Sequence, residues 1–131
     1  MNLADYFAGK QGTGILATAD GEGRVNAAVF SRPHILNDDR VAFIMPDRLT
    51  HHNLQTNPHA TYLFLEQGSH WSGKRLYLYK TGEEKDTELL HSLRRGRHGK
   101  KDIPRYLVFF KLEKELPLLG AGEDQGNGPA A

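Results

Sequence analysis

The chain has 131 residues, enough for one domain with a hydrophobic core and too few for two domains of typical size. Its 17 lysines and arginines nearly balance 16 acidic residues, so no overall charge draws it to nucleic acid or to an anionic membrane. The absence of cysteine excludes disulfides, thiolate metal ligands and thiol nucleophiles. No apolar run approaches the roughly 20 residues of a membrane helix, and the first residues do not resemble a signal peptide, so we expect a cytoplasmic protein.

The first third of the chain predicts one short helix followed by strands. Residues 3–7 carry apolar side chains at helical spacing behind Asn2, a good N-cap, which predicts a short helix. Small and β-branched residues follow on both sides of the turn sequence DGEG, which predicts a hairpin over residues 13–36. The apolar run at residues 40–46 predicts a third strand beside the second, and Pro46 ends it.

The rest of the chain continues the alternation of strands with short helices. It predicts a helix over 48–57, strands over 60–67 and 74–82, a helix capped by Asp86 or Thr87 through 88–96, and a strand over 106–116. Six strands with so few helices predict a mainly β fold, a small six-stranded antiparallel barrel within one domain at residues 1–118. We expect residues 119–131 to form a disordered tail, because this glycine-rich segment has almost no apolar side chain to bury.

The adjacent histidines His51 and His52 suggest a metal site. Neighbouring residues on a helix point about 100° apart, so this pair cannot bind one ion together. Metalloprotease histidines stand four residues apart with a glutamate between them, and no carboxylate lies between Arg48 and Ala60. We therefore predict no metal here, and expect His52 and His59 to be solvated or at the edge of the core.

The same segment offers donors for an anion. Arg48, Thr50 and the backbone N–H groups of a new helix gather where the third strand ends, and such donors together suit a phosphate. Ordinary capping of this helix by Asp47, with support from Thr50, explains the local sequence equally well. Both interpretations stay open at this stage.

Two further residues interrupt otherwise regular patterns. Asn26 lies in a run that should be buried, so its amide either pairs across the sheet or contacts a ligand, and the small Ala27 and Ala28 leave space beside it. Trp71 lies in a glycine-bounded loop, where an indole covers a ligand or a partner subunit more naturally than it fills a core.

Other patterns argue against common activities. The basic run at residues 94–101 has no interleaved aromatic residues for base stacking, so we interpret it as a solvated loop and expect no nucleic-acid partner. The sequence contains no G-x-S-x-G, no P-loop and no Rossmann glycine pattern, so hydrolase, nucleotide triphosphatase and dinucleotide-domain functions lose their usual support.

The segments GILATAD, GRVNAAVFSRP, VAFIMPDRLTHHNLQTNPHATYLFLE and GKRLYLYKTGEEKD, in this order, resemble the pyridoxamine 5'-phosphate oxidase-like FMN-binding split-barrel family. The resemblance covers roughly residues 12–118. It implies a homodimer with FMN at the interface. It also implies cofactor-binding roles for ten residues: Arg48 and Thr50 at the phosphate with Leu49 and His51 beside them, Asn26, Ala27, Ala28 and Met45 along the flavin, and Trp71 and Arg75 near the partner's flavin.

The resemblance implies an FMN-dependent oxidoreductase that acts on a small molecule or passes electrons to a partner, with no catalytic residue assigned. The arginine-containing C-terminal substrate motif of true pyridoxamine phosphate oxidases is not recognisable in KLEKELPLLG, so we do not expect that activity. The alternative is a non-catalytic module that holds flavin, deazaflavin or haem for storage or sensing. His51 or His91 would then be the candidate haem ligand.

Overall fold

A computed structural model describes residues 2–68, 70–94 and 103–120. Residues 121–131 of the predicted tail (119–131) and most of the basic run at 94–101 lie outside these residues. The described residues contain three short helices: α1 (Leu3–Phe7), α2 (Leu49–Thr56) and α3 (Glu88–Leu93). The strands are β1 (Gly12–Ala19), β2 (Val25–Val29), β3 (His34–Ile35), β4 (Val41–Pro46), β5 (His59–Glu66), β6 (Gly73–Lys85) and β7 (Arg105–Pro117).

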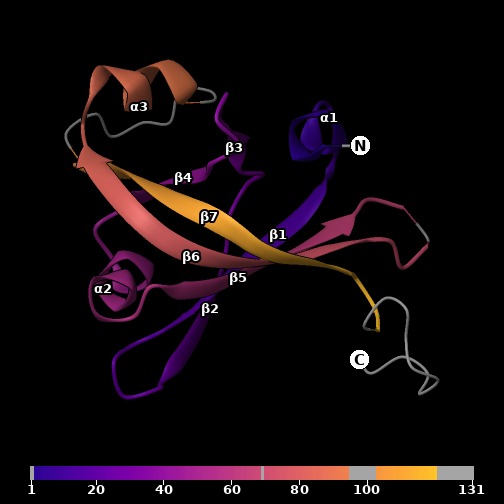
Figure 1. Cartoon of the computed structure of the whole chain (residues 1–131), viewed down its shortest axis with the longest axis horizontal. Helices are drawn as coiled ribbons and strands as arrows, with labels where there is room; N and C mark the ends of the chain where they lie inside the picture. The colour runs from indigo at the N-terminus through magenta and orange to yellow at the C-terminus, as the bar shows by residue number, and fades with distance from the viewer. Residues whose placement is uncertain (1, 69, 95–102, 121–131) are drawn as a thin grey trace.

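All seven strands belong to one antiparallel sheet in the order β2-β1-β5-β6-β7-β4-β3. The sheet curls strongly, with the long β6 and β7 sweeping across the molecule (Figure 1). β2 and β3, which follow each other in the chain, form its two edges and do not pair with each other. The predicted mainly β fold, a split barrel, is confirmed.

The opening of the barrel lies at the connection between β2 and β3. The sequence predicts one continuous strand through residue 36, whereas the structure divides it, which gives seven described strands instead of six. The Phe30 N–H still donates to the Gly14 carbonyl at 2.9 Å, but Pro33 has no N–H with which to continue a ladder. Beyond Pro33 the chain changes neighbour, and His34 and Ile35 pair with β4.

The interior of the barrel is filled by apolar and aromatic side chains. The fully buried members include Leu16, Tyr62, Phe64, Leu76 and Phe110. Burying such a side chain contributes roughly 1.5–3 kcal/mol. The predicted alternation in β6 is confirmed: Leu76 and Leu78 face this core, while the intervening tyrosines are 39% exposed.

The helices α1 and α3 begin at capping residues that the sequence predicts. Asn2 accepts a hydrogen bond from the Asp5 N–H at the start of α1, and Thr87 accepts one from the Leu90 N–H at the start of α3. Leu90 then packs against the outer side of β4 and β7 in a second apolar cluster. None of the described helices has the length and apolar character needed to cross a bilayer.

Replacing Gly14 with alanine should destabilise the fold. A Cβ at Gly14 would overlap the Tyr62 hydroxyl and lie 2.6 Å from the Phe30 carbonyl oxygen, so side chain and backbone would both have to move. We expect Gly14→Ala to lower the free energy of unfolding by about 1–3 kcal/mol in a urea titration, as overpacking does elsewhere. Gly21→Ala is the control, since its Cβ would meet Thr56 at an ordinary 3.5 Å. Equal stabilities of the two variants would contradict the prediction.

Candidate functional site

The helix α2 starts directly after β4, and its first turn has no side-chain cap. Arg48 is the N-cap residue, in extended conformation, and its side chain makes no capping hydrogen bond. The Arg48 side chain is exposed. Asp47 does not cap the helix either, because its carboxylate Oδ1 lies 2.9 Å from the His51 Nδ1 atom. The start of α2 therefore keeps its backbone donors and a cation side by side, as the anion interpretation requires.

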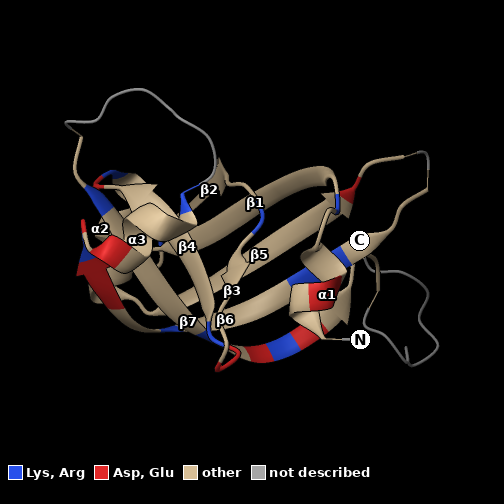
Figure 2. Cartoon of the chain, turned by 90° about the horizontal axis from the view of Figure 1, so that it is seen from above, with Lys and Arg blue, Asp and Glu red and all other residues tan. Residues whose placement is uncertain are grey.

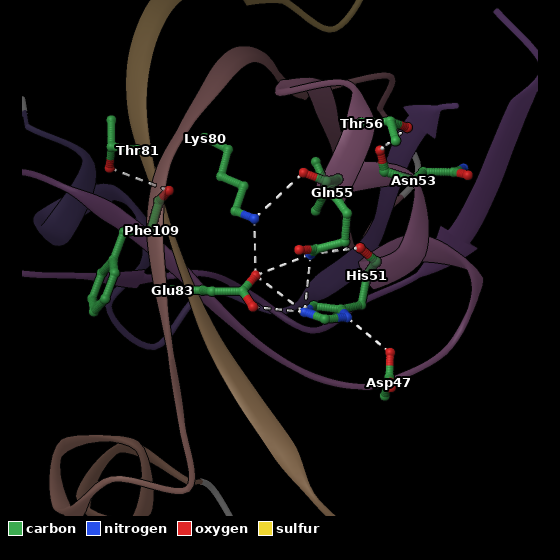
Figure 3. A network of polar contacts seen from close by, with 10 residues as sticks. Asp47, His51, Asn53, Gln55, Thr56, Lys80, Thr81, Glu83 and Phe109 are labelled. Atoms are coloured by element: carbon green, nitrogen blue, oxygen red, sulfur yellow. Dashed lines mark hydrogen bonds and ion pairs between the residues drawn. The ribbon is translucent and has the colours of Figure 1, made fainter. Parts of the chain in front are cut away.

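His51 joins this turn to β6 through a network of polar contacts (Figure 3). Its Nε2 atom lies 3.0 Å from a Glu83 carboxylate oxygen. Lys80 Nζ contacts the same carboxylate at 2.9 Å, and Gln55 Nε2 donates to it at 3.1 Å. The network ties the first and second turns of α2 to one short stretch of β6.

The imidazole of His51 is closed to a metal in this conformation. The residue is only 5% exposed, and its ring stacks on the Tyr106 ring with centroids 3.9 Å apart. Both ring nitrogens already contact carboxylates, so neither is open to haem iron. Among the described residues, no group of three or more histidines or carboxylates could hold a metal ion. His52 and His59 are exposed, as predicted, and so is His91.

A basic pocket lies at the opening of the barrel, between the β2–β3 connection, β4 and the start of β7. Its volume is about 170 Å³. It is lined by Phe30, Ser31, Arg32, His34, Phe43, Ile44, Arg94 and Arg105. Arg105 is paired with Pro46 across β7 and β4, which puts it next to the turn that leads to Arg48. The Arg32 guanidinium also donates to the Phe7 carbonyl at 2.8 Å, which anchors that wall of the pocket.

Sequence reasoning missed this pocket because its residues come from four separated segments. Arg105 is the first residue of β7. From the sequence, Arg94 is interpreted only as the first residue of a solvated basic loop. A weak signal was present, since Ser31-Arg32-Pro33 placed a cation near the end of a strand. Only the pairing of β4 with β7 shows that Arg105 comes near it.

The predicted residues of β2 lie close to α2. Asn26 is half-buried and pairs with Thr18, whose hydroxyl accepts a hydrogen bond from the Asn53 Nδ2 group at 3.1 Å. Ala28 is half-buried beside it, and Ala27 points to the exposed side of the sheet. The amide of Asn26 therefore lies near a buried polar pair that links β1 to α2.

The other predicted site residues differ in exposure and in their position on the sheet. Leu49 is 54% exposed, whereas Thr50 is 6% exposed and Met45 is fully buried within the barrel core. Trp71 is 72% exposed in the connection between β5 and β6. Figure 1 shows this connection at the end of the sheet opposite α2, so one chain does not bring Trp71 near Arg48. Arg75, on β6, donates to the Pro117 carbonyl at 2.9 Å and to that of Gly120.

The outer face of the sheet is apolar next to its β2 edge. Val29 is paired with Ile15, Ile15 with Leu63, and residues paired in this way point to the same side. Val25 and Val29 are 82% and 75% exposed, and Ile15 and Leu63 are half-buried. Tyr77 and Tyr79 extend the same face across β6. The paired residues Val29, Ile15 and Leu63 therefore form one continuous apolar row across β2, β1 and β5.

The donors at the opening of the barrel fit the phosphate of a flavin mononucleotide. Arginine side chains and uncapped helix amides are suitable groups for a phosphate, while Phe30, Phe43 and Ile44 provide an apolar wall beside them. The pocket is smaller than the roughly 300–1,000 Å³ of sites that enclose a cofactor-sized ligand. A flavin would therefore need the adjoining open surface as well. Elsewhere on the chain, basic and acidic residues are interspersed (Figure 2).

The sequence matches no family model and no curated protein. Solved structures do match. An FMN-binding protein from Syntrophomonas wolfei subsp. wolfei is 22% identical and has a TM-score of 0.71, with 88% of this chain and 82% of that chain covered. The chain has the split-barrel fold of that protein. It is likewise similar to HupZ of Group A Streptococcus, at 18% identity and TM-score 0.67 over 98% and 96% of the two chains.

An F420 reductase also shares the fold, with 13% identity and a TM-score of 0.62, over 88% of this chain and 97% of that chain. At these identities the comparisons show a common fold. The fold that the resemblance to the pyridoxamine 5'-phosphate oxidase-like family implies is thereby confirmed.

Glu83 should make the stability of the protein depend on acid pH. Burial raises the pKa of the Glu83 carboxyl, but hydrogen bonds from Lys80, His51 and Gln55 outweigh it and lower the pKa from 4.5 to about 2. Because the pKa of Glu83 is lower in the folded than in the unfolded protein, its carboxylate stabilises the fold at pH values above the unfolded-state pKa. This contribution is full above pH 4.5 and is lost as the pH falls toward 2.

We expect Glu83→Gln to lower the free energy of unfolding by on the order of 2 kcal/mol at pH 6, and the difference from wild type to shrink toward pH 3. Urea titrations between pH 3 and pH 6 measure this difference in the free energy of unfolding. Glu113→Gln, at an exposed position of β7, is the matched control. A difference between wild type and Glu83→Gln that stays constant with pH would refute this account.

Proposed function

We propose that this protein binds FMN at the opening of the barrel and acts as a homodimeric flavin-dependent oxidoreductase. The observation that carries the proposal is the group of cations where β4 ends: Arg48 at the start of α2, and Arg105 beside Pro46. In a chain with nearly balanced charge, such a local cluster is the natural place for an anionic cofactor. The similarity to an FMN-binding protein of the same fold supports the choice of FMN.

The phosphate would lie between Arg48 and the first turn of α2. The Arg48 guanidinium is exposed, and the helix start lacks a capping side chain that would compete for its N–H groups. Arg105 adds a second positive charge from the neighbouring strand. Thr50 is largely buried, so we expect it to support the turn more than to contact solvent-side groups.

The flavin ring would extend from the phosphate along the basic pocket. Phe30, Phe43 and Ile44 offer apolar contact, and Arg32 and Arg94 offer positive charge near the edge of the ring. When bound, the flavin supplies the electron or hydride transfer. The protein holds it, limits its contact with water and stabilises negative charge on the reduced ring through these arginines.

A second copy of this chain would complete the site. The apolar outer face next to β2 adjoins the strands that pack against α2, and its exposed valines favour an interface. An interface between two copies of this face would also cover the unpaired edge of β2. Trp71 and Arg75, which lie far from Arg48 within one chain, would then reach the partner's flavin.

A deazaflavin is the second candidate cofactor, because an F420 reductase has the same fold. The absorption spectrum of the loaded protein distinguishes the two cofactors. The substrate or redox partner is not assigned. Anaerobic reduction by NADH or NADPH tests whether a nicotinamide is the electron donor.

Removing the cations at the end of β4 should weaken FMN binding. We expect the wild type to bind one FMN per chain, measured by quenching of flavin fluorescence or by calorimetry. Arg48→Ala combined with Thr50→Ala, and separately Arg105→Ala, should each raise the dissociation constant by tenfold or more, because each removes a charge-assisted contact worth about 1.5–3 kcal/mol.

Arg40→Ala is the control for this experiment, since it removes the same charge from the turn before β4, at the strand's other end. If the cation-deleted variants bind FMN as tightly as Arg40→Ala does, the phosphate does not lie where we place it.

Placing a charge on the outer face should separate the dimer. We expect the wild type to elute as a dimer in size-exclusion chromatography with light scattering, and Val29→Asp to elute as a monomer, because a buried unpaired carboxylate is costly. Leu89→Asp is the matched control: Leu89 is 37% exposed, but lies on α3, away from this face. A monomeric wild type, or a dimeric Val29→Asp, would contradict the proposed interface.

A further inference from the structure

We propose that His51 is a positioning residue that makes the start of α2 selective for a flavin carrying a phosphate, by holding the carboxylate of Asp47 away from Arg48. The proposal rests on the proposed function, because His51 acts through the phosphate site and does not touch the ligand itself. The His51 ring is buried, and its contacts hold the exposed turn that precedes α2 in place.

His51 contacts the carboxylate of Asp47 at the start of α2. Asp47 immediately precedes Arg48, and its side chain is 62% exposed. A carboxylate at this position could cross to the guanidinium of Arg48, where it would compete with a phosphate and repel it. Instead it lies 2.9 Å from the His51 Nδ1 atom, so the five-residue turn is closed by this contact.

The opposite side of the His51 ring contacts residues of β6 and β7. The His51 Nε2 atom faces Glu83 at 3.0 Å, and the ring stacks on Tyr106 with 20° between the two planes. β6 and β7 thereby fix the orientation of the imidazole. Turning the ring would break the contact with Glu83, and in this orientation its Nδ1 atom is directed toward Asp47 (Figure 3).

Asp47, His51, Glu83 and Lys80 form one cluster of ionisable side chains. A neutral imidazole has one N–H and can donate to only one of the two carboxylates, whereas the imidazolium donates to both. With Lys80 at 2.9 Å from Glu83, the imidazolium form gives two positive and two negative groups. The cluster is then balanced within itself, and Arg48 remains outside it, available to an external anion.

Filling the space under α2 does not by itself require a histidine at position 51. A leucine or phenylalanine could fill the space under α2 against Tyr106 equally well. Such a residue would leave the Asp47 carboxylate without its partner, one residue from the proposed phosphate site. The consequence of losing His51 should therefore appear in binding of the phosphate more than in binding of the ring.

The test compares FMN with riboflavin, which has the same ring and no phosphate. We expect His51→Gln to raise the dissociation constant for FMN about tenfold while that for riboflavin changes less than twofold. Adding Asp47→Asn to His51→Gln should restore most of the FMN affinity, because the competing charge is gone. Both constants are measured on full-length protein by fluorescence quenching, with thermal melting to confirm that each variant is folded.

The outcomes are distinct. Equal losses for FMN and riboflavin, or no restoration by Asp47→Asn, would overturn the role of His51 even though the wild type binds FMN. A wild type that binds no FMN would overturn the proposed function itself. If His51→Gln does not fold, Glu83→Ala keeps the ring but removes the group that contacts its Nε2 side. The ratio of FMN to riboflavin affinity should then fall, and an unchanged ratio would refute the proposal.

Discussion

An irregularity in the pairing of β6 with β7 determines the arrangement around α2. Lys80 pairs with Phe110 and Gly82 with Phe109, so Thr81 is an extra residue in the ladder. In a regular strand, residues three apart point to opposite faces. The extra residue reverses the alternation, so Lys80 and Glu83 lie on one side and contact each other at 2.9 Å. Without this bulge, Glu83 would point away from His51, and the first turn of α2 would lose its support.

The opening of the barrel has a similar local cause. Pro33 cannot donate to a ladder, so the chain leaves β1 and crosses to β4, and the sheet keeps two separate edges. The connecting residues become a wall of the basic pocket. Tyr62 supports this wall from inside the core, because its hydroxyl donates to the Ser31 carbonyl at 3.1 Å. A residue that interrupts a strand thus also shapes the space where a ligand can enter.

The sequence predicts well whatever depends on neighbouring residues. Asn2 and Thr87 cap their helices as expected, and the alternation of Leu76 with Tyr77 identifies the inner and outer sides of β6. It predicts less where distant segments meet. Asp47 looks like a cap, but it contacts His51, whose other nitrogen is held by a residue 32 positions later. Arg105 joins the site only through strand pairing. Neither the bulge at Thr81 nor these contacts has a local signal.

The exposed valines of β2 carry a consequence for how the protein would behave in a cell. If the same face both joins two chains and completes the cofactor site, assembly and cofactor binding are thermodynamically linked. Dilution would then release cofactor even at constant flavin concentration, and abundant flavin would hold chains together that otherwise separate. The amount of active protein would rise more steeply than its expression level, so the abundance of the chain would itself regulate its activity.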